Sequence, residues 1–137
     1  MMNYENILRE HNLKATNQRV AILSIIEQKG HISIEDLYSK IKPDFPSISL
    51  ATLYKNMHAM LKNELLTEVK VENSKTHFEI VSDNHAHLYC EKCRELVDFD
   101  IEFEKLNNDI LKGSGFLLNK TNLTFSGICI SCQNILE

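Results

Sequence analysis

Apolar positions in the first 43 residues recur at the three- and four-residue steps of amphipathic helices. The pattern predicts a short helix over residues 4–12 and a second helix that Thr16 caps and Gly30 ends. A third helix is expected after Ser33, which has an acidic residue three positions later, as in a capping box, and this helix stops before Pro43. Each of these helices has one apolar face to bury.

A further helix is expected after Ser49, followed by a change to the two-residue period of strands. Its inward positions would be Leu50, Leu53, Met57, Met60 and Leu61, and its outer positions Ala51, Thr52, Lys55, Asn56 and Ala59. Residues 66–71 and 76–80 then read as two strands around a turn at residues 72–74. Helices followed by a hairpin give the element order of a winged helix-turn-helix domain.

The second half of the chain predicts a separate, mixed domain. A polar run at residues 82–84 indicates a hinge between domains at residues 1–81 and 85–137. Beyond the hinge we expect strands around His87–Cys90 and Glu95–Asp100, a helix beginning near Phe103 that Gly113 and Gly115 end, and a last strand over residues 116–125. The predicted fold class is therefore α+β, with a winged-helix domain and an α/β domain.

Composition excludes several classes of protein. The chain has 43% hydrophobic and 25% charged residues, which is the mix of a globular protein rather than a disordered one. Its longest apolar stretch, residues 20–26, is interrupted by Ser24 and is far shorter than the roughly 20 residues of a membrane span. The first residues do not resemble a signal peptide, so we expect a cytoplasmic location and no membrane contact.

Charge is divided unevenly along the chain. Residues 1–80 hold 10 basic and 10 acidic side chains, whereas residues 81–137 hold 5 and 9 and carry the whole net charge of −4. The first half can therefore approach phosphate groups, and the second half suits cations.

All four cysteines fall into two Cys-x-x-Cys pairs, Cys90 with Cys93 and Cys129 with Cys132. Four thiolates supply the tetrahedral coordination that zinc prefers, and such a closed site is structural. The alternative is a zinc-ribbon thiol oxidoreductase or interaction module. A redox pair usually lies at a helix N-terminus in a thioredoxin-like unit, and we predict a helix start at neither pair. The pattern therefore favours structural Zn²⁺.

His85 and His87 lie just before the first cysteine pair, and Asp98 lies just after it. In a strand, both histidines point to the same face, so both imidazoles can reach one ion. A mixed nitrogen and oxygen site suits Fe²⁺, Mn²⁺ or Zn²⁺. The alternative is that these are solvated histidines beside a zinc site. Taken alone, His31 and Glu79 are interpreted as ordinary capping or surface residues.

Four segments together resemble the signatures of the ferric uptake regulator family. They are Lys14–Arg19, Ser47–Asn56, His85–Cys93 and Gly127–Cys132, and they stand in the order and spacing of that family over nearly the whole chain. The resemblance implies a homodimer joined through C-terminal β-strands, with each winged helix on one half of a palindromic double-stranded DNA operator. It implies a transcription regulator, not an enzyme, and no small organic ligand.

The resemblance also implies two kinds of metal site. Structural zinc would be bound by the four cysteines, and regulatory Fe²⁺ or Mn²⁺ by residues of both domains: His31, Glu79, His85, His87 and Asp98. An ion held from both domains can fix their relative angle, and only one angle fits two DNA half-sites. This is a mechanism for metal-dependent repression.

The expected recognition helix begins near Ser49. Ala51 and Thr52 can touch thymine methyl groups, and Tyr54 can contact a base or phosphate unless it is a core aromatic. Phosphate contacts that set the register are expected from Lys14 and Arg19. The full predicted set of DNA-binding residues is Lys14, Arg19, Ser49, Ala51, Thr52, Tyr54, Lys55 and Asn56.

The sequence is most similar to the peroxide-sensing branch of this family. Asp98 matches that branch, whereas Glu79 stands where many peroxide sensors have Asp. Extra histidines that iron regulators use for a further metal site are absent, since those places read Asp83–Asn84 and Ser126–Gly127. We predict a repressor of oxidative-stress and iron-homeostasis genes that senses hydrogen peroxide by metal-catalysed oxidation of His31 or His85. The alternative is a sibling repressor that senses iron or zinc levels.

Overall fold

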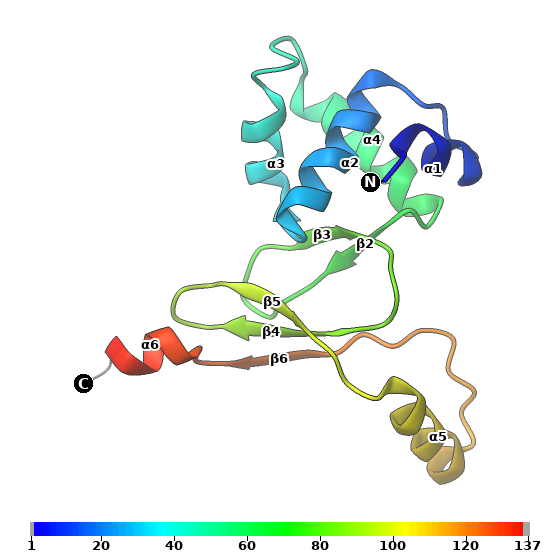
Figure 1. The fold of residues 1–137 in the computed structure, drawn as a ribbon, viewed down its shortest axis with the longest axis vertical. Helices are drawn as coiled ribbons and strands as arrows, with labels where there is room; N and C mark the ends of the chain where they lie inside the picture. Colours follow the sequence, from blue (N-terminus) through cyan, green and yellow to red (C-terminus); the bar gives the residue numbers. More distant parts are fainter. Residues whose placement is uncertain (1, 136–137) are drawn as a thin grey trace. The chain divides into compact units, whose positions relative to one another are not determined.

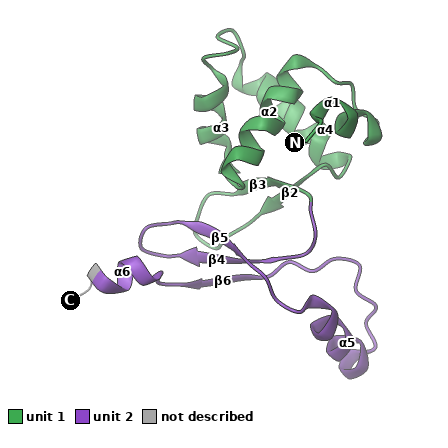
Figure 2. Cartoon of the chain, in the orientation of Figure 1, with its two compact units in different colours: residues 1–81 green, residues 82–137 purple. Residues whose placement is uncertain are grey.

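The computed structural model describes residues 2–135 and divides the chain into two compact units between Val81 and Ser82 (Figure 2). The last two residues of the predicted second domain, 136 and 137, lie outside the described part. Among the described residues, every helix is too short or too polar to cross a lipid bilayer. Each unit has its own three-stranded sheet.

The first unit contains four helices and a small antiparallel sheet, in the order helices, strand, helices, hairpin (Figure 1). Its elements are α1 Tyr4–Glu10, α2 Asn17–Lys29, β1 Ile32–Ser33, α3 Ile34–Ile41, α4 Leu50–Lys62, β2 Leu66–Val69 and β3 His77–Ile80. The strands lie in the order β1-β3-β2. The hairpin of β2 and β3 is confirmed, and its strands are slightly shorter than predicted. The short strand β1, which pairs with β3, was not predicted from the sequence.

Side-chain caps define the helix starts in this unit, as predicted. Thr16 accepts a hydrogen bond from the Arg19 amide at the start of α2, and Ser33 accepts from the third residue of α3. Ser49 does the same at the start of α4. Gly30 follows α2 with φ of +80°, a conformation that residues with a Cβ rarely adopt. These caps satisfy amide groups that the first turn of each helix leaves without a partner.

The core of the first unit is made by all four helices and the sheet. Fully buried side chains come from every helix: Leu8, Ile22, Leu23, Ile26, Leu37, Ile41, Leu53, Met57 and Met60. The prediction that Leu50 belongs to this core is wrong, because its side chain is 44% exposed. Leu50 is the first residue of α4, and side chains of a helix lean toward its N-terminus, so Leu50 projects past the core.

The second unit is a sheet with the order β5-β4-β6 and two helices. Its elements are β4 Ala86–Cys90, β5 Leu96–Phe99, α5 Phe103–Ser114, β6 Thr124–Gly127 and α6 Ile130–Ile135 (Figure 1). Strand β4 is antiparallel to β5 and parallel to β6. A parallel pair needs a long crossover, which α5 and its flanking segments provide.

Two expectations for this unit are wrong. The last strand was predicted over residues 116–125, but β6 begins only at Thr124. Residues 116–118 are apolar, which suggested a strand, yet they pair with no strand and are largely exposed. Both Gly113 and Gly115 were expected to end the helix, but α5 runs through Gly113 to Ser114, so only Gly115, whose φ is +77°, ends it.

Candidate functional site

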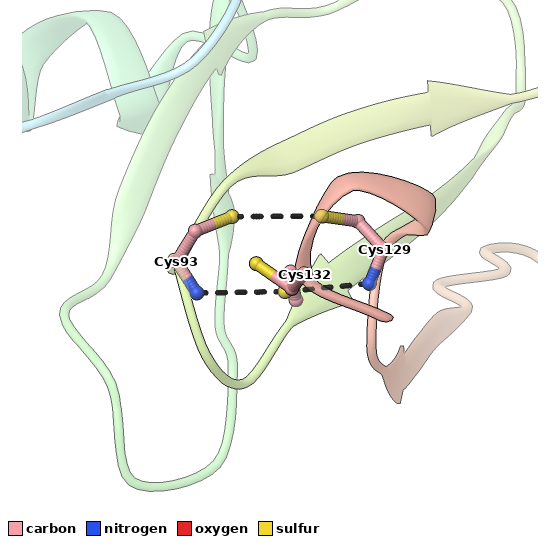
Figure 3. Close-up of side chains that lie close together, drawn as sticks. Cys93, Cys129 and Cys132 are labelled. Atoms are coloured by element: carbon pink, nitrogen blue, oxygen red, sulfur yellow. Dashed lines mark hydrogen bonds between the residues drawn. The ribbon is translucent and has the colours of Figure 1, made fainter. Parts of the chain in front are cut away.

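The four cysteine sulfurs of the second unit form one cluster, in which all four lie within 4.8 Å of one another. The sulfurs of Cys93 and Cys129 are 3.8 Å apart (Figure 3). The amides of Cys93 and Cys129 both donate to the Cys90 sulfur, at 3.5 and 3.4 Å. Cys132 is buried in the same cluster. The four thiols therefore provide the closed, all-sulfur site that suits structural zinc.

The parallel pairing of β4 and β6 explains why residues 36 or more positions apart meet. Cys90 ends β4 and is paired with Gly127, the last residue of β6. Each strand thus delivers its Cys-x-x-Cys pair at the same edge of the sheet. The prediction that neither pair lies at a helix start is wrong for the second pair, because Cys129 directly precedes α6 and Cys132 lies in it. A helix start is typical of redox pairs, but here it faces the other pair, as a four-ligand site requires.

Charge in the cluster is shared unequally among the thiols. The amide of Cys129, and then that of Cys93, donates to the Cys90 sulfur and lowers the pKa of this thiol to about 6. The hydrogen bond with the Cys129 thiol, together with burial, raises the pKa of Cys132 to about 12. One thiolate therefore suppresses ionisation of its neighbours, and a divalent cation is what allows four adjacent thiols to ionise together.

A second group of metal-binding side chains in this unit comes from the start of β4 and from β5. The Nε2 atoms of His85 and His87 lie 3.0 Å apart. Each of these atoms is 3.4 Å from Oδ1 of Asp98. The sheet register brings this about, because His87 is paired directly with Asp98. Two imidazoles and a carboxylate thus converge, as the sequence analysis expected.

The hydrogen bond on the far side of the His85 ring fixes its tautomer. Nδ1 of His85 lies 2.9 Å from the carbonyl oxygen of Asp83. A carbonyl oxygen only accepts hydrogen bonds, so Nδ1 carries a proton, and Nε2 is the ring nitrogen that faces His87 and Asp98. Metal-ligating histidines are commonly oriented by this kind of contact.

The first unit holds a smaller pair of potential ligands. Nε2 of His31 lies 3.2 Å from Oε2 of Glu79, and both side chains are 9% exposed. His31 directly precedes β1, and the antiparallel register that pairs Ile32 with Phe78 places it opposite Glu79. The default interpretation of these two residues as surface groups is therefore wrong, since Glu79 is buried, His31 is largely enclosed, and the two are in contact with each other.

The start of α4 exposes most of the side chains predicted to touch DNA. Ala51, Tyr54 and Lys55 are exposed, so Tyr54 is not a core residue. The hydroxyl of Ser49 donates to that of Thr52 at 2.9 Å, and the Thr52 amide donates back at 3.1 Å. The two hydroxyls thus stabilise the first turn of the helix.

Asn56 is not on the open outer face that the sequence analysis assigned to it. It is half-buried, its Oδ1 accepts from Nε of Arg19 at 3.1 Å, and its Nδ2 donates to Gln18 at 3.2 Å. Nη1 of Arg19 also donates to the carbonyl of Lys14 at 3.1 Å. Gln18 was not predicted as part of this site, although its position beside Arg19 at the start of α2 was a signal.

Comparisons with known proteins identify the family of this chain. Residues 10–126 match the model of the ferric uptake regulator family. The chain is 31% identical to the peroxide-responsive repressor PerR of Staphylococcus aureus over 93% of its length and 87% of that protein. Among solved structures it resembles the peroxide stress regulator of Campylobacter jejuni (TM-score 0.78, 34% identity, 96% and 100% of the two chains covered). It also resembles the ferric uptake regulator of Vibrio cholerae (TM-score 0.79, 28% identity, 93% and 100% covered).

Proposed function

This chain belongs to the ferric uptake regulator family, and from that membership we propose that it is a cytoplasmic, metal-dependent transcriptional repressor that responds to hydrogen peroxide. The observation that carries the proposal is the convergence of His85, His87 and Asp98 in a chain similar to a peroxide-responsive repressor. Its targets would be oxidative-stress and iron-homeostasis genes.

The winged helix of the first unit would bind duplex DNA, with α4 in the major groove. The exposed side chains of Ala51, Tyr54 and Lys55 near the start of α4 support this role, because the N-terminal residues of a recognition helix contact base edges. Lys14 and Arg19 would grip phosphate groups beside it.

The second unit would join two copies of the chain. Its sheet exposes large apolar side chains, Val97 and Phe99 on β5 and Phe125 on β6, and an exposed apolar patch is typical of a protein–protein interface. A two-fold dimer presents two copies of α4, which fits a palindromic operator.

The regulatory metal would draw its ligands from both units. His31 and Glu79 would come from the first unit, and His85, His87 and Asp98 from the second. The mixed imidazole and carboxylate donors support Fe²⁺ or Mn²⁺ as the bound ion. By restricting the angle between the units, these ligands would favour the arrangement that fits two half-sites.

Peroxide would release repression by damaging a ligand. Bound by these residues, Fe²⁺ would supply electrons for the reduction of hydrogen peroxide, which Mn²⁺ would not readily do. The imidazoles of His31 and His85 are the side chains that we expect to gain oxygen. An oxidised imidazole is a poorer ligand, so the five residues would no longer hold the units at the DNA-binding angle.

One residue favours the second candidate, a repressor that senses iron or zinc levels. Glu79 stands where many peroxide sensors have Asp, and the longer side chain changes how the carboxylate reaches an ion. In that case the same ligands would report occupancy of the site and no histidine would be oxidised.

Mass spectrometry separates the two candidates. Zinc-loaded protein is reconstituted with Fe²⁺ or Mn²⁺ and given a brief, low dose of hydrogen peroxide, with DNA binding assayed in parallel. The peroxide sensor predicts one added oxygen on peptides containing His31 or His85, only with Fe²⁺, and loss of binding. His58 and His77, outside the proposed site, serve as internal controls. Unmodified His31 and His85 with retained binding would leave the metal-level sensor.

A further inference from the structure

A chain of hydrogen bonds joins the start of α2 to the middle of α4 within the first unit. Nε of Arg19 donates to Oδ1 of Asn56 at 3.1 Å, and Nδ2 of Asn56 donates to Oε1 of Gln18 at 3.2 Å. The partners are 37 and 38 positions apart in the sequence, and both bonds are partly buried. The contact is therefore a tertiary link between two helices, each of which carries predicted DNA contacts.

The chemistry of the three side chains determines which atom donates and which accepts in these two hydrogen bonds. The Arg19 guanidinium can only donate, so the oxygen of the Asn56 amide must face it. The nitrogen of Asn56 then faces Gln18, whose oxygen must accept. Both ends of the Asn56 amide are thus used inside the protein.

This arrangement conflicts with a base-reading role for Asn56. Asparagine recognises adenine through both ends of its amide, with the nitrogen and oxygen paired to N7 and N6 of the base. Asn56 could do so only by breaking its bonds to Arg19 and Gln18. Tyr54 and Lys55, two positions and one position before it, are exposed and face no such conflict.

These hydrogen bonds fix the conformation of the Arg19 side chain. Its Nε is held by Asn56 and its Nη1 by the carbonyl of Lys14 at 3.1 Å. Its own amide is held by the Thr16 cap at 3.2 Å. A long side chain that is already ordered loses less conformational entropy when it binds, and a fixed planar guanidinium suits phosphate.

We propose that Asn56 and Gln18 are positioning residues that hold the Arg19 guanidinium ready for a DNA phosphate, and that Asn56 reads no base. The inference rests on the proposed DNA-binding function and assigns a division of labour within it. Asn56 acts on affinity through Arg19, whereas Tyr54 and Lys55 meet the DNA directly.

Quantitative DNA binding tests this assignment. The probe is the tightest duplex recovered from a randomised pool by the zinc- and manganese-loaded protein, together with every single-base variant of that duplex. Asn56→Ala should weaken binding about tenfold on all of these duplexes alike, as expected for losing a hydrogen bond to a charged group. Loss of preference at one base pair would instead identify Asn56 as a base reader and overturn the proposal.

The salt dependence of binding and a double-mutant cycle test whether Asn56 acts through Arg19. Neither measurement would change in this way if Asn56 only stabilised the fold. Arg19→Ala should reduce the slope of log affinity against log salt by about 0.9 for each phosphate that the arginine neutralises. Asn56→Ala should shift the slope in the same direction, and the Arg19→Ala, Asn56→Ala double variant should bind no more weakly than Arg19→Ala alone. Additive losses of affinity would show that the two residues act independently and would sink the proposal.

Two further variants separate positioning from unfolding. Gln18→Ala removes one link near the surface of α2 and should give a weaker, uniform loss in the same direction. His58→Ala, an exposed change on the same helix as Asn56, should leave affinity and slope unchanged. If the wild-type protein recovers no preferred duplex, the DNA-binding function itself fails; if it does and Asn56→Ala binds normally, only this inference fails.

Discussion

The two units of this protein differ in what encloses their apolar side chains. Every residue of the main core cluster lies between Leu8 and Phe78, in the first unit. In the second unit few apolar side chains are buried, and Phe99, Phe116, Leu117 and Phe125 are each at least half exposed. The first unit therefore buries its own apolar surface, and the second leaves much of its apolar surface uncovered.

The difference shows where each unit obtains its stability. A unit of fewer than roughly 70–80 residues seldom gains enough from burial alone and needs a metal, a cross-link or a partner. The second unit has the four-cysteine cluster and an exposed apolar sheet, which suit a metal and a partner respectively. Residues 2–81 of the first unit have neither a four-cysteine cluster nor an exposed apolar sheet, and their stability relies on packing.

Removing zinc should have the largest effect and should be confined to the second unit. Zinc binding by thiolates contributes on the order of 10 kcal/mol to folding of small domains. A strong chelator, or Cys93→Ser, should therefore collapse amide NMR signals of residues 82–135 while those of residues 2–81 persist. Ser131→Ala, an exposed change between two of the cysteines, is the matched control. Loss of both sets of signals together would show that the units are not independent.

A cavity in the core of the first unit should destabilise the first unit and leave the second unit folded. Leu23 is fully buried in α2, and Leu23→Ala should cost about 2–5 kcal/mol because it removes buried methyl groups and leaves a cavity. Urea unfolding followed by NMR should show early loss of residues 2–81, with zinc still bound. An equal shift in the urea midpoints of both units would contradict the conclusion that the two units are stabilised separately.

Placing a charge on the uncovered sheet should act on association rather than folding. Phe125 is half exposed on β6, and Phe125→Glu would bury a carboxylate at the proposed interface. Sedimentation should show the dimer weakened by at least tenfold, equivalent to about 1.4 kcal/mol, with melting of the first unit unchanged. Asn119→Glu adds the same charge at an exposed polar position and should leave the dimer intact.

The smallest effect is expected at the cap of the recognition helix. Ser49 accepts the Thr52 amide and donates to the Thr52 hydroxyl. Ser49→Ala should destabilise the first unit by about 1 kcal/mol, measured as a small shift in its urea midpoint. Ser49→Asp retains a capping acceptor and should recover most of that loss.

Local chemistry made much of the fold predictable. Three helix caps were predicted and are confirmed, at Thr16, Ser33 and Ser49. Each has a short side chain whose oxygen accepts a hydrogen bond from an amide in the first turn of the helix that follows. The cysteine cluster was predictable because paired spacing reflects the tetrahedral geometry of zinc. The meeting of His85, His87 and Asp98 followed from strand alternation and the family resemblance.

The features that were missed depend on contacts distant in sequence. β1 is a strand only because β3 lies beside it, and two residues carry too little pattern to show this. The start of β6 is set by its pairing with β4, not by the apolar run that precedes it. The helical spacing placed Asn56 on the outer face of α4. In the structure its side chain forms hydrogen bonds with Arg19 and Gln18, which are 37 and 38 positions away in the sequence.

The parallel pairing of β4 with β6 also determines when, during synthesis of the chain, the cysteine cluster can form. A ribosome delivers the first unit complete once residue 81 has emerged, whereas Cys90 must wait for β6 and Cys129 before its cluster can close. At about 5–20 residues per second, the nascent chain spends roughly 2–10 s with a finished N-terminal domain and an unfinished C-terminal one. In the later part of that interval Cys90 and Cys93 have emerged, and the other two cysteines of their cluster have still to follow.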